Sequence, residues 1–220
     1  MPLLDLLLPS RTPYHRETHG VQQRRRLVVV ATCVVGALLL AVALAQPYGS
    51  TAFDLVALAL GATWIGGAVL SGPLHLGRVA GRRDVIGPVI LGVLAFAVFA
   101  VGMLVVREIP TLHRAVSDVL HRADVGPRVL AVAVAVGNGV AEEVFFRGAL
   151  YSSFGARRPA LYSTIVYVLV TAAAGNVMLA FAAAIMGSLF AIERRATRGV
   201  LAPMTTHIVW STLMIFLLPR

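Results

Sequence analysis

Residues 137–151 of the chain, GNGVAEEVFFRGALY, place three charged side chains inside an apolar run. Glu142 and Glu143 are adjacent, and Arg147 follows Glu143 by four residues, so that on a helix Glu143 and Arg147 share a face and can form an ion pair. Glu142 points about 100° away from Glu143 on the same helix and has no local partner. The spacing therefore predicts one ion-paired carboxylate and one carboxylate without a local counter-charge.

The two glutamates are predicted to have different roles because their surroundings differ. An acid at the centre of a membrane helix costs roughly 2.5–3.5 kcal/mol, and pairing with Arg147 compensates this cost for Glu143 alone. Two carboxyl groups in environments that differ in this way can take different acid–base roles in a reaction. Glu142 is therefore the candidate for proton transfer and Glu143 its structural neighbour. The alternative, that the triplet is only a polar clamp between helices, stays open at this point.

A second polar cluster lies in the last apolar segment, VLAPMTTHIVWSTLMIF. His207 and Ser211 are four residues apart and share a helix face. At about 1.5 Å per residue, His207 lies roughly 12 Å from the start of its helix and Glu142 roughly 21 Å from the start of an oppositely directed helix. The two residues are therefore expected at nearly the same depth. Tyr167 and Thr171, in an earlier segment, are also four residues apart, a spacing that helix packing explains.

The composition indicates that lipid surrounds these residues. Of 220 residues, 58% are hydrophobic and 13% charged, and the mean hydropathy is +0.84, against roughly 45–50% apolar residues in soluble domains. All 19 basic residues are arginines. They lie in short clusters between apolar segments and not on one face of a soluble fold, so no nucleic-acid partner is expected. The single Cys33 leaves neither an intrachain disulfide nor a cysteine metal cluster.

Apolar runs near the length of about 20 residues that a bilayer-spanning helix needs predict an all-α, polytopic membrane helical bundle. About seven transmembrane helices are expected, at 27–45, 53–72, 85–106, 128–150, 160–175, 177–193 and 200–218. The short segments 160–175 and 177–193 could instead form a tight re-entrant hairpin. Residues 110–124 carry apolar and charged side chains on opposite helix faces, which predicts an amphipathic helix in the membrane interface.

Arginine counts predict the orientation, because cytoplasmic loops carry the excess of basic residues. Five arginines precede the first segment and the next loop has none, whereas the 107–128 loop departs from the pattern with four arginines on the predicted outer side. The N-terminus is therefore expected in the cytoplasm and the C-terminus outside. Residues 1–26 form a cytoplasmic tail in this interpretation, and 27–220 form a single transmembrane domain in a cell membrane. The arginine-, alanine- and valine-rich usage favours a bacterial plasma membrane.

The glutamate segment resembles the EExxxR signature of the CPBP family, the CAAX-protease and bacteriocin-processing intramembrane endopeptidases that include Abi-type proteins. Two further elements follow in the family's order. The FxxxH helix corresponds to Tyr167 through Thr171, and the last helix with its HxxxN pattern to His207 through Ser211. The resemblance covers a core of about residues 128–218 and implies hydrolysis of a peptide bond within or near the membrane.

The resemblance also implies roles for individual residues. The candidate catalytic residues are Glu142, Glu143, Arg147, Thr171, His207 and Ser211. Glu142 would activate water, and His207 with Ser211 would stabilise the oxyanion. This sequence departs from the family at two positions, because Thr171 replaces the histidine of the second motif and Ser211 replaces the final asparagine. Threonine cannot accept a proton as histidine does.

The leading hypothesis is an intramembrane endopeptidase that opens to the cytoplasm and acts on a membrane-associated peptide or protein in contact with membrane lipid. The alternative is a non-catalytic family member that binds a partner membrane protein, which the threonine at position 171 favours. A proton-coupled transporter is a third class, but the two halves of the chain lack a transporter-like repeat. No cofactor is expected. Catalytic zinc usually takes three protein ligands, and the chain could offer only Glu142, Glu143 and His207.

Overall fold

The computed structural model describes residues 19–47, 50–77, 81–121, 128–155 and 158–218. Within these ranges the chain is helical and contains no strand, which confirms the predicted all-α polytopic bundle. The helices are α2 (His19–Ala45), α3 (Thr51–Ser71), α4 (Arg83–Val106), α5 (Pro110–Leu120), α6 (Arg128–Glu142), the π-helix η2 (Glu143–Leu150), the short α7 (Tyr151–Ser153), α8 (Pro159–Ala172), α9 (Val177–Thr197) and α10 (Leu201–Leu217).

Seven apolar helical segments run across the bundle in the part of the chain that the structure describes. Five are long and apolar enough to cross a bilayer, namely α2, α3, α4, α9 and the continuous segment from α6 through η2 and α7, and α8 and α10 are shorter. Large apolar side chains are exposed on the outer faces of these helices, whereas arginine, glutamate and histidine side chains are buried inside. This inverted distribution is that of a multi-pass membrane protein.

The first helix begins earlier than the sequence predicts. α2 starts at His19 and not at residue 27, so residues 19–26 of the expected tail are helical. The reason is Arg25, whose buried guanidinium donates hydrogen bonds to Ser71 Oγ at 3.0 Å and to the carbonyl of Pro73 at 2.6 Å. These bonds fasten the start of α2 to the end of α3. The remainder of the expected tail, residues 1–18, lies outside the described residues.

Helices α8 and α9 form an antiparallel hairpin of unequal arms. α8 has 14 residues and is therefore about 21 Å long, which is shorter than a bilayer core of about 30 Å, whereas α9 has 21 residues. Gly175 turns the chain with φ 76°, a left-handed conformation that costs glycine nothing sterically. Asn176 then caps α9, because its Oδ1 accepts hydrogen bonds from the backbone N–H groups of Met178 and Leu179.

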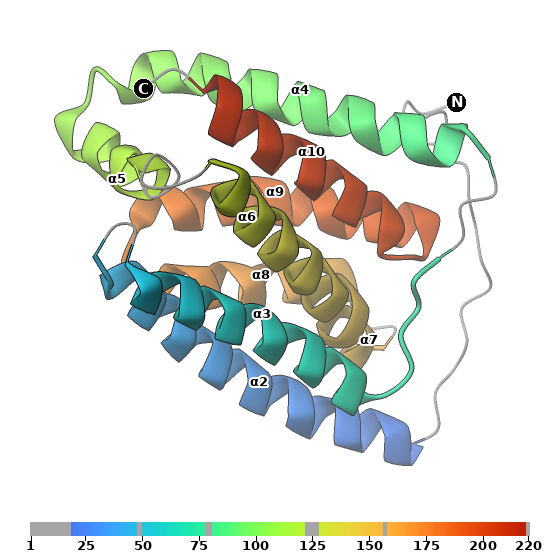
Figure 1. Cartoon of the computed structure of the whole chain (residues 1–220). Helices are drawn as coiled ribbons and strands as arrows, with labels where there is room; N and C mark the ends of the chain where they lie inside the picture. Colours follow the sequence, from blue (N-terminus) through green and yellow to red (C-terminus); the bar gives the residue numbers. More distant parts are fainter. Residues whose placement is uncertain (1–18, 48–49, 78–80, 122–127, 156–157, 219–220) are drawn as a thin grey trace.

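The amphipathic element expected at 110–124 is present as α5, although residues 122–127 lie outside the described residues. α5 lies at one end of the bundle, and the arginine-rich ends of α9 and α2 lie at the other (Figure 1). A hydrogen bond of 2.7 Å from Asn176 Nδ2 to the carbonyl of Ala115 ties α5 to the start of α9. The location of α5 in a membrane interface stays a prediction.

Two glycines let α2 and α3 pack closely. A Cβ at Gly36 would collide with the ring of Trp64, which is only 1% exposed, and a Cβ at Gly67 would collide with the side chain of Thr32. Gly66, the neighbour of Gly67, has open space where its Cβ would be. Small residues at such crossings are what allow membrane helices to approach each other.

Gly67→Ala is expected to lower the free energy of unfolding of the protein in detergent by about 1–3 kcal/mol, because the added methyl group forces α2 and α3 apart at Thr32. Gly66→Ala is the matched control and should leave stability unchanged or slightly raised. Thermal unfolding followed by size-exclusion chromatography measures both. Equal stability of the two variants would show that the helix crossing is not as tight as the structure has it.

Candidate active site

Glu143 and Arg147 form a buried ion pair on η2. Arg147 Nη1 lies 3.2 Å from Glu143 Oε1, and the two side chains are 1% and 0% exposed. Arg147 Nη2 also donates a hydrogen bond of 3.1 Å to the carbonyl of Gly187 on α9. The guanidinium carbon lies 4.5 Å from the ring centroid of Tyr167 and 5.1 Å from that of Phe190. The ion pair that the four-residue spacing predicts is therefore present.

The backbone that carries this ion pair is π-helical and not α-helical. The sequence predicts one continuous α-helix over 128–150, but the α-helix ends at Glu142 and Glu143–Leu150 is a π-helix whose eight residues are all buried. π-Helical turns are rare and occur frequently at functional sites. No sequence signal distinguishes such a segment from an ordinary helix.

His207, on α10, is held in place by Glu143. Its Nδ1 lies 3.2 Å from Glu143 Oε1, and its ring stacks on Phe190 with a centroid distance of 4.8 Å. On another side the ring covers Gly139, where a Cβ would come within 3.3 Å of it. An ionised carboxylate can only accept a hydrogen bond, so Nδ1 is assigned as the donor and carries a proton. Nε2 is then the ring nitrogen that is left for other partners.

Glu142 faces a different set of groups from Glu143. Its Oε2 accepts a hydrogen bond of 2.8 Å from the Tyr167 hydroxyl on α8. No protein group among the described residues hydrogen-bonds to Oε1, and the side chain is half-buried. The two glutamates therefore have the different surroundings that the sequence predicts, their different roles stay a prediction, and Tyr167 is a partner of Glu142 that the sequence does not predict.

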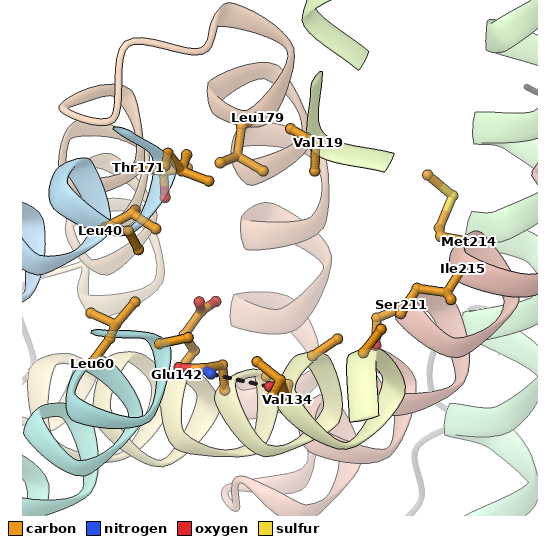
Figure 2. Close-up of a pocket in the computed structure, with 18 of the residues that line it drawn as sticks. Leu40, Leu60, Val119, Val134, Glu142, Thr171, Leu179, Ser211, Met214 and Ile215 are labelled. Carbon is orange, nitrogen blue, oxygen red and sulfur yellow. Dashed lines mark hydrogen bonds between the residues drawn. The ribbon is translucent and has the colours of Figure 1, made fainter. Parts of the chain in front are cut away.

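A cavity of about 420 Å³ brings most of the candidate residues together (Figure 2). Its walls are mainly apolar. The polar side chains that line it belong to Asp54, Asn138, Glu142, Tyr167, Thr171, His207 and Ser211, with Trp210 beside them. In Figure 2, Glu142 and Thr171 lie on one side of this space and Ser211 on the other. Glu143 and Arg147 do not line the cavity and lie behind it, in the protein interior.

The cavity extends toward the α5 end of the bundle. Its lining includes the end of α2 at Leu44, the start of α3 at Asp54, the start of α6 at Leu130 and the end of α10 at Ile215. These helix ends lie opposite the arginine-rich ends, which the sequence analysis places in the cytoplasm (Figure 1). The lining therefore lies toward the end of the bundle away from the face predicted to be cytoplasmic, and the expected opening to the cytoplasm stays a prediction together with the orientation.

The two hydroxyl residues that replace family side chains both donate to their own helices. The Thr171 hydroxyl donates to the carbonyl of Tyr167 at 2.8 Å, and the Ser211 hydroxyl to the carbonyl of His207 at 2.8 Å. A hydroxyl has one hydrogen to donate. Each side chain lines the cavity, but its hydroxyl hydrogen is already donated to a backbone carbonyl and is not directed at a ligand.

The structure adds polar residues that the sequence analysis did not select. Asn138 lines the cavity one helical turn before Glu142, and its Nδ2 donates to the Val134 carbonyl (the dashed line in Figure 2). Behind the cavity, Glu193 is fully buried and its Oε1 accepts a hydrogen bond of 2.6 Å from Thr206. The four-residue interval between Asn138 and Glu142 could have indicated that both lie on the same helix face. Nothing in the sequence indicates that Glu193 pairs with Thr206.

A metal centre does not fit the side chains as they lie. Among the described residues, no group of three or more His, Cys, Asp or Glu side chains converges closely enough to hold a metal ion. Glu142, Glu143 and His207, the three ligands that the sequence could offer, do not converge on one point. The two glutamates point to different surroundings, and His207 Nδ1 is directed at the Glu143 carboxylate.

Fold and site together define a polytopic helical membrane protein with a paired acidic motif beside an intramembrane cavity. Residues 124–213 match a family model described as type II CAAX prenyl endopeptidase Rce1-like. The match includes the glutamate motif, α8, α9 and most of α10, and confirms the resemblance to the CPBP and CAAX-protease family. The matched residues cover less than half of the chain, and at the level of that family they support a hydrolase that acts on peptide bonds. The searches of curated proteins and of solved structures found no match.

Arg147→Met is expected to destabilise the fold by about 3–5 kcal/mol, because it leaves the Glu143 carboxylate buried without its counter-charge. Unfolding in mixed detergent micelles measures this loss. Adding Glu143→Gln to the same protein should recover part of the stability, since no uncompensated charge then remains. A single Arg147→Met variant as stable as the wild type would contradict the structural role of the ion pair.

Proposed function

We propose that this chain is an intramembrane endopeptidase that hydrolyses a peptide bond of a membrane-associated protein or peptide, with Glu142 as the base that activates water. The observation that carries the proposal is the position of the Glu142 carboxylate. One oxygen is hydrogen-bonded to Tyr167, and the other has no protein partner among the described residues in a cavity that His207 also lines. The family match of residues 124–213 supports the reaction class.

The proposed reaction begins with a water molecule beside Glu142 Oε1. The carboxylate takes one proton from the water as the water oxygen bonds to the scissile carbonyl carbon. The tetrahedral intermediate then collapses, the C–N bond breaks, and the protonated Glu142 gives its proton to the leaving amine. The products are a carboxylic acid and an amine, which become a carboxylate and an ammonium group when the second proton of the water passes from the acid to the amine, and Glu142 returns to its ionised starting form. A positioned acid–base group of this kind contributes typically 10²–10⁴-fold to the rate.

His207 is proposed to stabilise the oxyanion of the intermediate. Its Nδ1–H is directed at Glu143, so a ring protonated on both nitrogens presents Nε2–H to the substrate. The Glu143 carboxylate stabilises this imidazolium electrostatically, and Arg147 fixes the position of Glu143. Donors held in place before the reaction are the most effective way to stabilise such an oxyanion. Glu143 and Arg147 are in this account positioning residues.

Ser211 and Thr171 are proposed to shape the cavity wall. The Ser211 hydroxyl would have to leave the His207 carbonyl before it could donate to a substrate oxygen. Thr171 is in the same situation with the Tyr167 carbonyl. The oxyanion role that the resemblance implies for Ser211 therefore requires a rotation of its side chain.

A non-catalytic binding function is the second candidate. It is favoured by Thr171, because a threonine whose hydroxyl donates to its own helix supplies neither a base nor an acid where the family has a histidine. In this alternative the apolar cavity binds a segment of a partner membrane protein, and the glutamates serve only packing and binding.

Glu142→Gln is expected to abolish peptide hydrolysis, with kcat lower by 10²-fold or more and with unchanged thermal stability. The assay uses a fluorogenic farnesylated peptide that ends in a CAAX sequence, together with its unprenylated counterpart. Glu108→Gln, at an exposed site outside the cavity, is the matched control and should retain full activity. Cleavage by the Glu142 variant at the wild-type rate would refute the base assignment. Binding of the peptides by the wild type without cleavage would favour the second candidate.

The orientation predicted from the arginines, combined with the direction of the cavity, places the cavity mouth at the outer face. Single cysteines at Thr111 in α5 and His19 in α2, both exposed, are introduced after Cys33→Ala. A membrane-impermeant maleimide applied to intact cells should label position 111 and reach position 19 only after permeabilisation. The reverse pattern would show that the N-terminus is outside and that the cavity faces the cytoplasm.

A further inference from the structure

We propose that Tyr167 positions the catalytic base of this protein. In this inference, which rests on the proposed function of Glu142, the tyrosine hydroxyl fixes the Glu142 carboxylate and takes the place of a side chain from position 171. Tyr167 is thus a positioning residue of the reaction and not only a packing residue between α6 and α8.

The hydroxyl of Tyr167 is directed at Glu142 by a rigid ring. The donor–acceptor distance to Glu142 Oε2 is 2.8 Å, the usual length of a hydroxyl–oxygen hydrogen bond. The ring contacts Phe146 edge-on with a centroid distance of 4.7 Å. At Gly187 an added Cβ would come within 2.9 Å of the ring atom Cδ1. The ring therefore has little freedom to turn, and its hydroxyl has one place to donate.

The same arginine orders the surroundings of both glutamates. Arg147 pairs with Glu143 through Nη1, and its guanidinium carbon lies 4.5 Å from the centroid of the Tyr167 ring, whose hydroxyl reaches Glu142. A cation over an aromatic face is stabilising, and more so when both groups are desolvated. Tyr167 is therefore held by the structural ion pair on one side and holds the reactive carboxylate on the other.

No other described residue hydrogen-bonds to the Glu142 carboxylate. Thr171 lies one turn further along the same face of α8 and lines the same cavity, but its hydroxyl donates to the Tyr167 carbonyl. Of the two α8 side chains on this wall, only Tyr167 can therefore orient the base.

The role of Tyr167 leaves the proton balance of the reaction unchanged. Its Oη keeps its hydrogen and donates to Oε2 throughout, so Oε1 is the oxygen that takes the proton from water. When Glu142 is protonated, the proton then lies on the cavity side, where the leaving amine is formed. Loss of the hydroxyl should impair the chemical step and leave substrate binding intact.

The test is Tyr167→Phe, which keeps the ring and removes the hydroxyl. With the farnesylated CAAX peptide, kcat is expected to fall at least 10-fold with KM within twofold of the wild type. Tyr162→Phe, the same substitution on the same helix but at an exposed site outside the cavity, should be unaffected. The double variant Tyr167→Phe/Thr171→His, which offers an imidazole one turn along α8, is expected to recover part of the lost kcat.

A second measurement does not depend on turnover. Infrared difference spectra against Glu142→Gln assign the carboxylate stretching band of Glu142, and this band should move in Tyr167→Phe and not in Tyr162→Phe. An unmoved band, or a Tyr167→Phe variant with wild-type kcat, would overturn the inference. Loss of cleavage in Glu142→Gln with full cleavage in Tyr167→Phe would refute the tyrosine role alone, whereas full cleavage in Glu142→Gln would refute the proposed function itself.

Discussion

The buried ion pair between Arg147 and Glu143 is the interaction on which the rest of the site depends. Two charges in the core of a lipid-embedded bundle are tolerable only when each is compensated, and the compensation here draws on four helices. Arg147 and Glu143 lie on η2, the carbonyl of Gly187 and the ring of Phe190 come from α9, the ring of Tyr167 comes from α8, and His207 comes from α10. The helices of the family-like segment are thus packed around one guanidinium and one carboxylate.

This constraint explains how two neighbouring acids have different surroundings. Consecutive residues on a helix point about 100° apart, so when Glu143 faces the arginine, Glu142 must face another direction. That direction is the cavity, where one of its oxygens meets the Tyr167 hydroxyl and the other is left for a ligand. In the proposed function, Glu143 therefore maintains the structure and Glu142 acts as the base.

Much of the fold followed from the sequence, because the bilayer imposes a length on each apolar helix and the i, i+4 rule fixes the partner of Glu143. The common depth of Glu142 and His207 followed from helix rise. The bond from His207 to Glu143 and not to Glu142 could not be predicted, because it depends on how α10 is rotated about its axis. The π-helix, the early start of α2 at the buried Arg25 and the direction of the cavity also arise from tertiary packing that no local pattern encodes.

The most direct measurement of the central claim is a single-turnover cleavage of the farnesylated CAAX peptide in water enriched in ¹⁸O, with mass spectrometry of the new C-terminus. If Glu142 activates a water molecule that attacks the scissile carbonyl, the carboxylate of the released fragment carries one ¹⁸O atom and Glu142 carries none. An unlabelled product together with ¹⁸O in Glu142 would mean that the glutamate attacks the peptide itself. The absence of any product from bound peptide would contradict the assignment of this cavity as a protease site.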